Sequence, residues 1–339
     1  MKTILKKWLS KPAKALGTEL LTGWSGQRLL LPFYHMVSDD DPVHVKYLYP
    51  AQTTKRFKAD LDFLHRHFRP VSHTYLTEHV RNRLAIKENC FFLSFDDGLR
   101  EFYDVAAPIL EQRGIPATCF INTAFIDNRD MLFRMKASIL TGKIKINPLT
   151  PGQKKLFTDI FNQYNLRYND ASDLMKVTDH NRELLDAAAA AVEVSFPEYL
   201  STHRPYLTTS QIHELVRRGF SIGAHSVSHP CYQILPEEMQ VKQTLDCLDH
   251  LATNFNVGER LFSFPYTDFN IKSAFFEKIR DHVDLSFGTA GLKTDSEETN
   301  LQRISMEAPG YRSGEEIVST EQLYFIIKRL AGKHKIRRN

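Results

Sequence analysis

The stretch FFLSFDDG, residues 91–98, constrains the fold more than any other. Its apolar run from Phe91 to Phe95 predicts a strand inside a sheet, because four large apolar side chains so close together would not all face solvent. Two carboxylates, Asp96 and Asp97, follow at the strand end, and a strand that is turning can aim both into one cleft. Two adjacent anions repel each other, and burial strengthens the repulsion. We therefore expect a positive group beside them, most simply a metal ion.

Further metal ligands are expected in GAHSVSHP, residues 223–230. His225 and His229 are four residues apart, and one turn of helix would place both rings on the same face. Two imidazoles and one carboxylate suit zinc and related ions, and three protein ligands with an open position are typical of a catalytic site. The alternative is that both are unrelated surface histidines and that the aspartates cap a helix. The combination of both patterns, each after an apolar strand, favours the metal site.

The composition is that of an ordinary globular protein, with 42% hydrophobic and 25% charged residues. The net charge of +4 is too small to argue for nucleic-acid binding. Basic residues gather at both ends, in MKTILKKWLSKPAK and KRLAGKHKIRRN. Solvated termini are the favoured interpretation. A basic N-terminal segment carrying Trp8 and Leu9 could also contact an anionic membrane surface.

No signal peptide or membrane span is expected from the apolar pattern. Lysines interrupt the N-terminal segment, and no run of about 18 apolar residues occurs anywhere in the sequence. The interrupting residues are Lys2, Lys6, Lys7, Lys11 and Lys14. The four cysteines, at 90, 119, 231 and 247, are scattered and lack zinc-ribbon spacing. These features predict a reduced, cytoplasmic protein.

Strands and helices alternate along most of the chain. Apolar strands are expected at 29–34, 69–72, 91–95 and 115–122, with helices at 54–68, 75–84 and 100–112. This alternation predicts an α/β fold with parallel crossovers. Residues 128–206 break the rhythm and predict an inserted helical subdomain. The rhythm resumes with a capping box at 208–211, and further strands are expected at 261–268, 285–289 and 301–306.

Three of these motifs together resemble those of a known family. LSFDDG at 93–98, HSVSHP at 225–230 and a strand ending in FPY at 264–266 are similar to motifs of the polysaccharide deacetylase family of carbohydrate esterases. The start Phe33-Tyr34-His35 and the flanking stretches RGIPATCFI and LVRRGFSIGAHS fit as well. The likeness covers roughly 27–125 and 205–310 and leaves out the helical insertion.

The resemblance implies a distorted (β/α)7-8 barrel, and the break in the rhythm adds an inserted helical subdomain. Together they predict a basic lead-in (1–26), a first barrel part (27–127), the insertion (128–206), a second barrel part (207–312) and a basic C-terminal helix and tail (313–339). It implies one divalent metal ion, usually Zn2+, held by Asp97, His225 and His229. Asp96 would be the catalytic base, and the N–H of Tyr266 would stabilise negative charge on the acyl oxygen. All these residues follow strands, where barrel active sites lie.

Two positions depart from the family pattern. Many members have an arginine two residues before the proline of the third motif, and Ser263 stands there in this chain. Members also carry a histidine near the last strand as general acid, and LQRISMEAPG, residues 301–310, contains none. His35, at the end of the first strand, is a candidate for that role. Arg303 and Glu307 are further candidates.

Three functions remain open at this point. The first is a metal-dependent hydrolase that removes acetyl groups from an amino sugar or glycan, which is polymeric or lipid-linked. The second is a catalytically impaired glycan-binding relative with the same fold. The third is an accessory protein that uses its basic ends at a membrane or on nucleic acid. An intact base beside an intact ligand set favours the hydrolase.

Overall fold

The computed structural model describes residues 2–339, with side chains from Leu5 onward; Met1 and the side chains of residues 2–4 lie outside the described part. Within this part the largest sheet has eight parallel strands in the order β11-β9-β8-β7-β6-β5-β2-β12. They are β2 (Pro32–Tyr34), β5 (Leu93–Phe95), β6 (Ala117–Ile121), β7 (Ser221–Ala224), β8 (Leu261–Ser263), β9 (Leu285–Gly288), β11 (Asn300–Gln302) and β12 (Ile304–Ser305).

The two edge strands of this sheet are consecutive in the chain. Only Arg303 separates β11 from β12, yet β11 pairs with β9 and β12 pairs with β2 at the opposite edge. The chain itself therefore joins the two edges, and the sheet forms a nearly closed parallel barrel. This confirms the predicted distorted (β/α)7-8 barrel.

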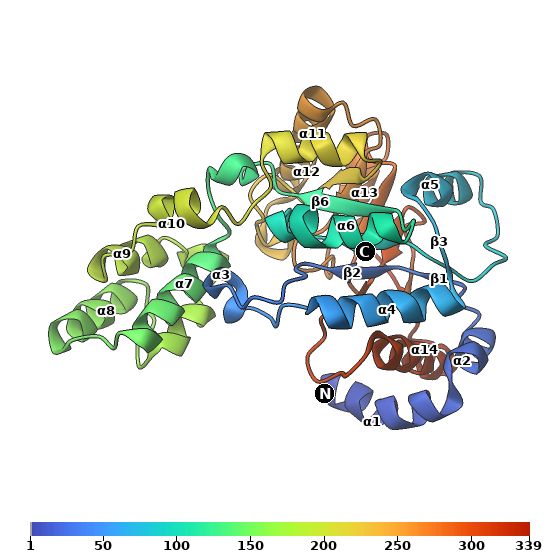
Figure 1. The fold of residues 1–339 in the computed structure, drawn as a ribbon, viewed down its shortest axis with the longest axis horizontal. Coiled ribbons are helices and arrows are strands. Elements are labelled where there is room, and N and C mark those ends of the chain that lie inside the picture. Colours follow the sequence, from blue (N-terminus) through green and yellow to red (C-terminus); the bar gives the residue numbers. More distant parts are fainter. Residues whose placement is uncertain (1) are drawn as a thin grey trace.

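Helices cover the outside of the barrel (Figure 1). They are α4 (Thr54–His67), α5 (His73–Arg81), α6 (Ala107–Gln112), α11 (Thr209–Arg217), α12 (Glu237–Phe255) and α13 (Ser273–Ile279). Helix α4 buries Phe57, Leu61 and Leu64, the apolar positions that recur at helical spacing. The predicted capping box at Thr208 and Gln211 starts α11. Apolar helix faces against apolar strands thus build the main core.

Several predicted elements are divided in the structure. The strand expected at 29–34 forms β1 (Leu29–Leu30) and β2, and that at 91–95 forms β4 (Cys90–Phe91) and β5. β4 pairs with both β1 and β3 (Arg69–Pro70) in a separate three-stranded sheet. The helix expected at 100–112 opens with a π-helical turn, Phe102–Ala106. The strand expected at 301–306 is interrupted at Arg303, where the chain passes from one sheet edge to the other.

Between β6 and α11 the described chain is helical, and Figure 1 shows it as a lobe beside the barrel. The lobe contains α7 (Phe133–Ile146), α8 (Pro151–Gln163), α9 (Leu184–Ala191) and α10 (Phe196–His203), with short 3-10 turns at Ile126–Asn128, Ala171–Lys176 and Asp179–Asn181. It has its own hydrophobic cluster, onto which α3 (Val43–Lys46) also packs. The boundaries 128–206 remain a prediction.

The N-terminal helices and the last helix of the chain pack together on one side of the barrel. Helix α14 (Gly314–Leu330) lies between α4 and α1 (Lys2–Leu16), and α2 (Thr18–Ser25) packs beside it (Figure 1). The last residues form β13 (Lys335–Ile336), which pairs with β10 (Thr294–Asp295). Among residues 2–339, no helix combines the length and the apolar character needed to cross a bilayer.

Candidate metal centre and catalytic site

The predicted site residues follow neighbouring barrel strands. His35 follows β2, Asp96 and Asp97 follow β5, His225 follows β7, and Tyr266 comes three residues after β8. Because these strands are parallel, their carboxyl ends open at one mouth of the barrel. The barrel therefore gathers side chains that are up to 231 residues apart in the sequence.

Asp97, His225 and His229 are the one acidic and histidine cluster in the described chain with metal-ligand geometry. Their ligand atoms lie within 4.8 Å of one another, and all three residues are buried. The Nε2 atoms of His225 and His229 are 3.4 Å and 3.3 Å from Oδ1 of Asp97. Three donor atoms from two strand ends thus converge on one point.

The protonation of these groups fits a cation at that point. Nδ1 of His225 is 2.8 Å from the carbonyl oxygen of Ser263, so this nitrogen carries the proton and Nε2 presents its lone pair. Burial lowers the pKa of His229, which favours the neutral ring. Burial would raise the pKa of Asp97, but the two imidazoles hold it well below its usual range. Oδ1 of Asp97 has no hydrogen-bond partner among the described residues, although it is buried. A buried carboxylate oxygen beside two imidazole nitrogens, with no hydrogen-bond donor directed at it, is the arrangement typical of a metal site.

The two histidines lie on a loop, not on the helical turn that their spacing suggested. Ser226 and His229 have φ values of 70° and 55°, a left-handed conformation that is rare outside glycine. The backbone N–H of His229 donates to Ser226 Oγ at 3.0 Å, and the Asn122 amide donates to the carbonyl oxygens of His225 and Ser226. Side chains therefore stabilise a strained loop, and this loop aims both rings inward.

Asp96 forms an ion pair with Arg303, the residue between β11 and β12 at which the barrel closes. Arg303 Nη1 and Nη2 donate to the two carboxylate oxygens at 2.8 Å and 2.7 Å, and the guanidinium also donates to Ser94 and Ser263. Arg303 is 0% exposed and Asp96 is buried. Burial would raise the pKa of Asp96, but the charge and hydrogen bonds of Arg303, together with the nearby His225 and His35, lower it below its usual value. The guanidinium missing at position 263 is thus supplied from position 303. The short side chain of Ser263 leaves space for the Arg303 guanidinium, and its hydroxyl oxygen accepts a hydrogen bond from Arg303.

His35 is held by Glu307. Its Nδ1 is 2.5 Å from Glu307 Oε2, while Glu307 Oε1 accepts from the backbone N–H groups of His35 and Met36. Burial would lower the pKa of His35, but Glu307 raises it to about 9, with further contributions from Asp97 and Asp96. The ring stacks on Tyr49, at 4.8 Å between centroids. The Tyr49 hydroxyl is buried and has no partner among the described residues. The sequence motifs did not single out Tyr49, because it lies outside any strand end.

Tyr266 borders the metal cluster from the next loop. Its ring packs edge-on against His229, with 4.5 Å between centroids, and is 37% exposed. Its backbone is left-handed, with φ of 58°. The carbonyl oxygen of Tyr266 accepts from Thr289, and Asp268, two residues later, pairs with Arg338 of the C-terminal tail. The loop is therefore held at Tyr266 itself and two residues after it.

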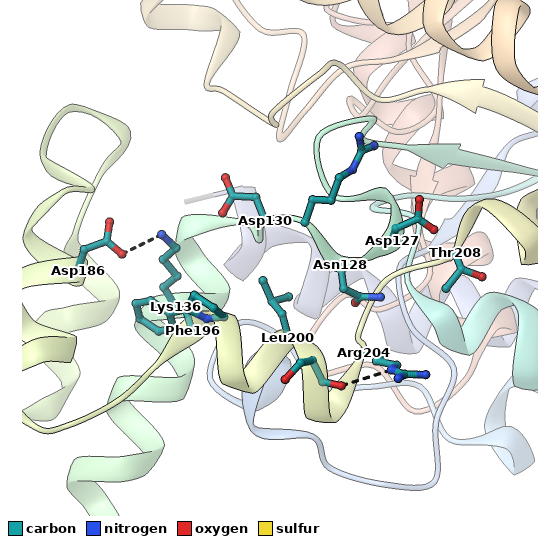
Figure 2. A pocket seen from close by; sticks show the side chains of 12 residues that line it. Asp127, Asn128, Asp130, Lys136, Asp186, Phe196, Leu200, Arg204 and Thr208 are labelled. Carbon is teal, nitrogen blue, oxygen red and sulfur yellow. Dashed lines mark hydrogen bonds and ion pairs between the residues drawn. The ribbon is translucent and has the colours of Figure 1, made fainter.

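A cavity of about 550 Å3 lies away from this cluster, where the helical lobe meets the loop after β6. Figure 2 shows Lys136 of α7 paired with Asp186 of α9, and Phe196 and Leu200 of α10 beside them. None of the predicted site residues lines it; the lining residues are Asp127, Asn128, Arg129, Asp130, Lys136, Asp186, Phe196, Pro197, Leu200, Ser201, Arg204 and Thr208.

Comparisons with known proteins agree with the motifs and the fold. The polysaccharide deacetylase family model matches residues 84–141 and 177–278, and the unmatched 142–176 fall in the helical lobe. A Streptococcus pyogenes deacetylase, PplD, in complex with acetate, is 17% identical, with 86% of this chain and 97% of PplD covered and a TM-score of 0.54. IcaB from Ammonifex degensii is also 17% identical, with coverage of 87% and 97% and a TM-score of 0.54.

At this identity the likeness to the two solved structures concerns the fold. A search of curated proteins found no match. The family match, the three motifs at the mouth of one barrel and the shared fold point the same way. The chain is similar to the polysaccharide deacetylase family in its motifs and in its fold.

Proposed function

We propose that this protein is a metal-dependent deacetylase that hydrolyses the N-acetyl group of an amino sugar or glycan. The observation that carries the proposal is the convergence of Asp97, His225 and His229 beside a separate, arginine-paired carboxylate, Asp96. The three ligands would hold one divalent ion, with Zn2+ the best match to two imidazoles and a carboxylate. When bound, such an ion supplies a Lewis acid for the attacking water and the acyl carbonyl.

Asp96 has the properties of the catalytic base. The Arg303 charge keeps its carboxylate ionised, and its bonds from Arg303 fix its orientation. In the proposed reaction, water adds to the acetyl carbon and its proton passes to Asp96. The backbone N–H of Tyr266 donates to the carbonyl oxygen as negative charge grows there. The amide C–N bond then breaks and acetate is released.

His35 has the properties of the general acid. The leaving sugar nitrogen needs a proton, and Glu307 keeps the His35 ring protonated at neutral pH. Because Glu307 contacts Nδ1, Nε2 is the nitrogen left to face substrate. The buried Tyr49 hydroxyl beside it is a polar group available to the acetyl or sugar oxygen.

The catalytically impaired alternative finds no support at these residues. It rested on the missing general acid, and His35, held by Glu307, is a candidate for that role. We also propose that the helical lobe shapes the choice of glycan. The lobe contacts the histidine loop, because the carboxylate of Asp179 accepts a hydrogen bond from the backbone N–H of Cys231, two residues after His229. The four unpaired cysteines among the described residues fit a reducing compartment such as the cytoplasm.

The test is acetate release from a panel of N- and O-acetylated sugars, with and without a chelator. We expect release from at least one N-acetylated sugar, loss with the chelator and recovery with Zn2+. Asp96→Asn should lower the rate by about 10²–10⁴-fold while sugar binding persists. Unchanged acetate release by Asp96→Asn would contradict the assignment of the base, and chelator-resistant release would contradict the assignment of the metal.

A further inference from the structure

Two exposed tryptophans lie on the outer surface of the N-terminal helices. Trp8 of α1 is 78% exposed and Trp24 of α2 is 52% exposed. Their helices pack inward through other residues: Ala13 and Leu21 are buried, and Lys6 of α1 pairs with Glu321 of α14. The tryptophans therefore contribute little to the packing of these helices on α14.

Each tryptophan has an exposed leucine on the same helix face. Leu5 lies three residues before Trp8, and Leu20 lies four residues before Trp24, so each pair is adjacent on its helix surface. Leu330, 83% exposed, ends α14 close to α2, since Arg329 donates to the carbonyl oxygens of Trp24 and Ser25. A soluble helix normally carries polar residues on its outer side. We call these five apolar side chains, Leu5, Trp8, Leu20, Trp24 and Leu330, the tryptophan face.

The charge around the tryptophan face is positive. Lys7, Lys11 and Lys14 are exposed on α1, and none of the three takes part in an ion pair within the described residues. Glu19 is the one acidic residue between positions 5 and 28. At the other end of the chain Lys333, Lys335 and Arg337 are exposed as well. Uncompensated lysines beside exposed tryptophan and leucine are the pattern of a helix that lies in a membrane interface.

We propose that the tryptophan face binds the surface of an anionic lipid bilayer. Indole rings are amphipathic and settle at the level of the lipid headgroups, with leucine side chains entering the acyl boundary. The lysines would contact anionic headgroups, each strengthening binding roughly fivefold. Binding of a second copy of this chain through the same face would instead bring lysines against lysines, which disfavours self-association. This inference is independent of the deacetylase chemistry.

Intrinsic fluorescence provides a direct test, because the protein has two tryptophans and both belong to this face. Full-length protein is titrated with vesicles of equal parts phosphatidylglycerol and phosphatidylcholine, and with vesicles of phosphatidylcholine alone. We expect a blue shift of the emission and co-sedimentation with the anionic vesicles, at least tenfold weaker binding to the neutral ones, and weakening by salt.

Matched variants distinguish binding through the tryptophan face from non-specific adsorption of the protein to vesicles. Trp8→Ser combined with Trp24→Ser should abolish co-sedimentation, and Lys7→Gln, Lys11→Gln and Lys14→Gln together should weaken it about hundredfold. Ile146→Ser removes an equally exposed apolar side chain, at 77%, from the end of α7, and should bind like the parent. Circular dichroism should show every variant folded. Three outcomes would overturn the proposal: no binding to anionic vesicles, equal binding by the double tryptophan variant, or a vesicle-free dimer that this variant disrupts.

Discussion

Arg303 and Asp96 form a two-bond ion pair in the interior of the barrel, with N–O distances of 2.8 Å and 2.7 Å. The residues are 207 positions apart. Arg303 is the single residue between β11 and β12, so the step that closes the barrel also delivers the guanidinium to the proposed base. Phe33 and Phe120 flank the guanidinium, at 4.3 Å and 5.4 Å from their ring centroids. Barrel closure and site electrostatics therefore depend on the same side chain.

Replacing this arginine should damage both stability and activity. Arg303→Met leaves the Asp96 carboxylate buried without its counter-charge, which we expect to cost about 3–5 kcal/mol in the free energy of unfolding. The pKa of Asp96 should rise, so the acidic limb of the pH–rate profile should move to higher pH. Urea unfolding and the pH dependence of kcat/KM measure these effects. Combining Arg303→Met with Asp96→Asn should recover part of the stability; if it recovers none, the pairing is not the source of the loss.

Moving the arginine to the family position tests the spatial equivalence of residues 263 and 303. Ser263→Arg alone places a second guanidinium into a fully buried site, and we expect more than about 1–3 kcal/mol of destabilisation from overpacking and like charge. Ser263→Arg together with Arg303→Ser removes the conflict and should be more stable than the single variant. Thermal unfolding of the two variants gives the comparison. A double variant less stable than Ser263→Arg would contradict the equivalence.

The His35–Glu307 pair predicts a defined pH dependence. Glu307 raises the pKa of His35 to about 9, so the proton that His35 donates should be lost, and activity with it, as pH rises through this value. In Glu307→Gln the pKa should fall toward the ordinary value of about 6.5, and the basic limb of the profile should shift to lower pH.

The stability of the folded protein should depend on pH in the same direction as its activity. A raised histidine pKa stabilises the folded state fully below about pH 6.5, and this contribution disappears as pH rises through about 9. Urea unfolding of the parent and of Glu307→Gln between pH 6 and 10 should therefore converge at high pH. Parallel pH curves for the two proteins would show that the pair does not titrate as described.

Metal occupancy should depend on each member of the ligand cluster. Parent protein should retain about one divalent ion per chain by elemental analysis, and His225→Ala should lose it. Zinc at a hundredfold excess over its Kd should stabilise the parent by about 2.7 kcal/mol in thermal unfolding and leave the variant unchanged. His282→Ala, on an exposed histidine outside the cluster, is the matched control. Full occupancy in His225→Ala would rule the ligand assignment out.

The C-terminal tail should influence the Tyr266 loop. The side chain of Arg338 is buried and pairs with Asp268 and Asp295, and it donates to the carbonyl oxygen of Ile271. Arg338→Met leaves two carboxylates without a cation, which should cost about 3–5 kcal/mol. Arg338→Lys should lose less. We expect kcat to fall in both while metal content, measured by elemental analysis, stays at the parent level. An unchanged kcat in Arg338→Met would separate the tail from the active-site loop.

Local sequence was sufficient for many of the elements and for the cluster of Asp97, His225 and His229. Apolar runs and helical periodicity report burial within a few residues, so α4, the capping box of α11 and the strand before Asp96 followed from the sequence. The proposed ligands could be predicted because each belongs to a short motif next to a strand end. In a parallel barrel, strand ends share one mouth whatever their separation in the chain.

Long-range pairing was decided by the tertiary structure alone. No local pattern assigns Arg303 to Asp96, Glu307 to His35 or Arg338 to Asp268, because each partner is chosen by barrel closure rather than by neighbouring residues. The helical turn predicted for His225 and His229 was wrong for a related reason: spacing fits a helix, but Ser226 and His229 adopt left-handed backbone that the surrounding hydrogen bonds stabilise. The sequence by itself thus determined which residues end the strands. Packing of the closed barrel determined which charges meet there.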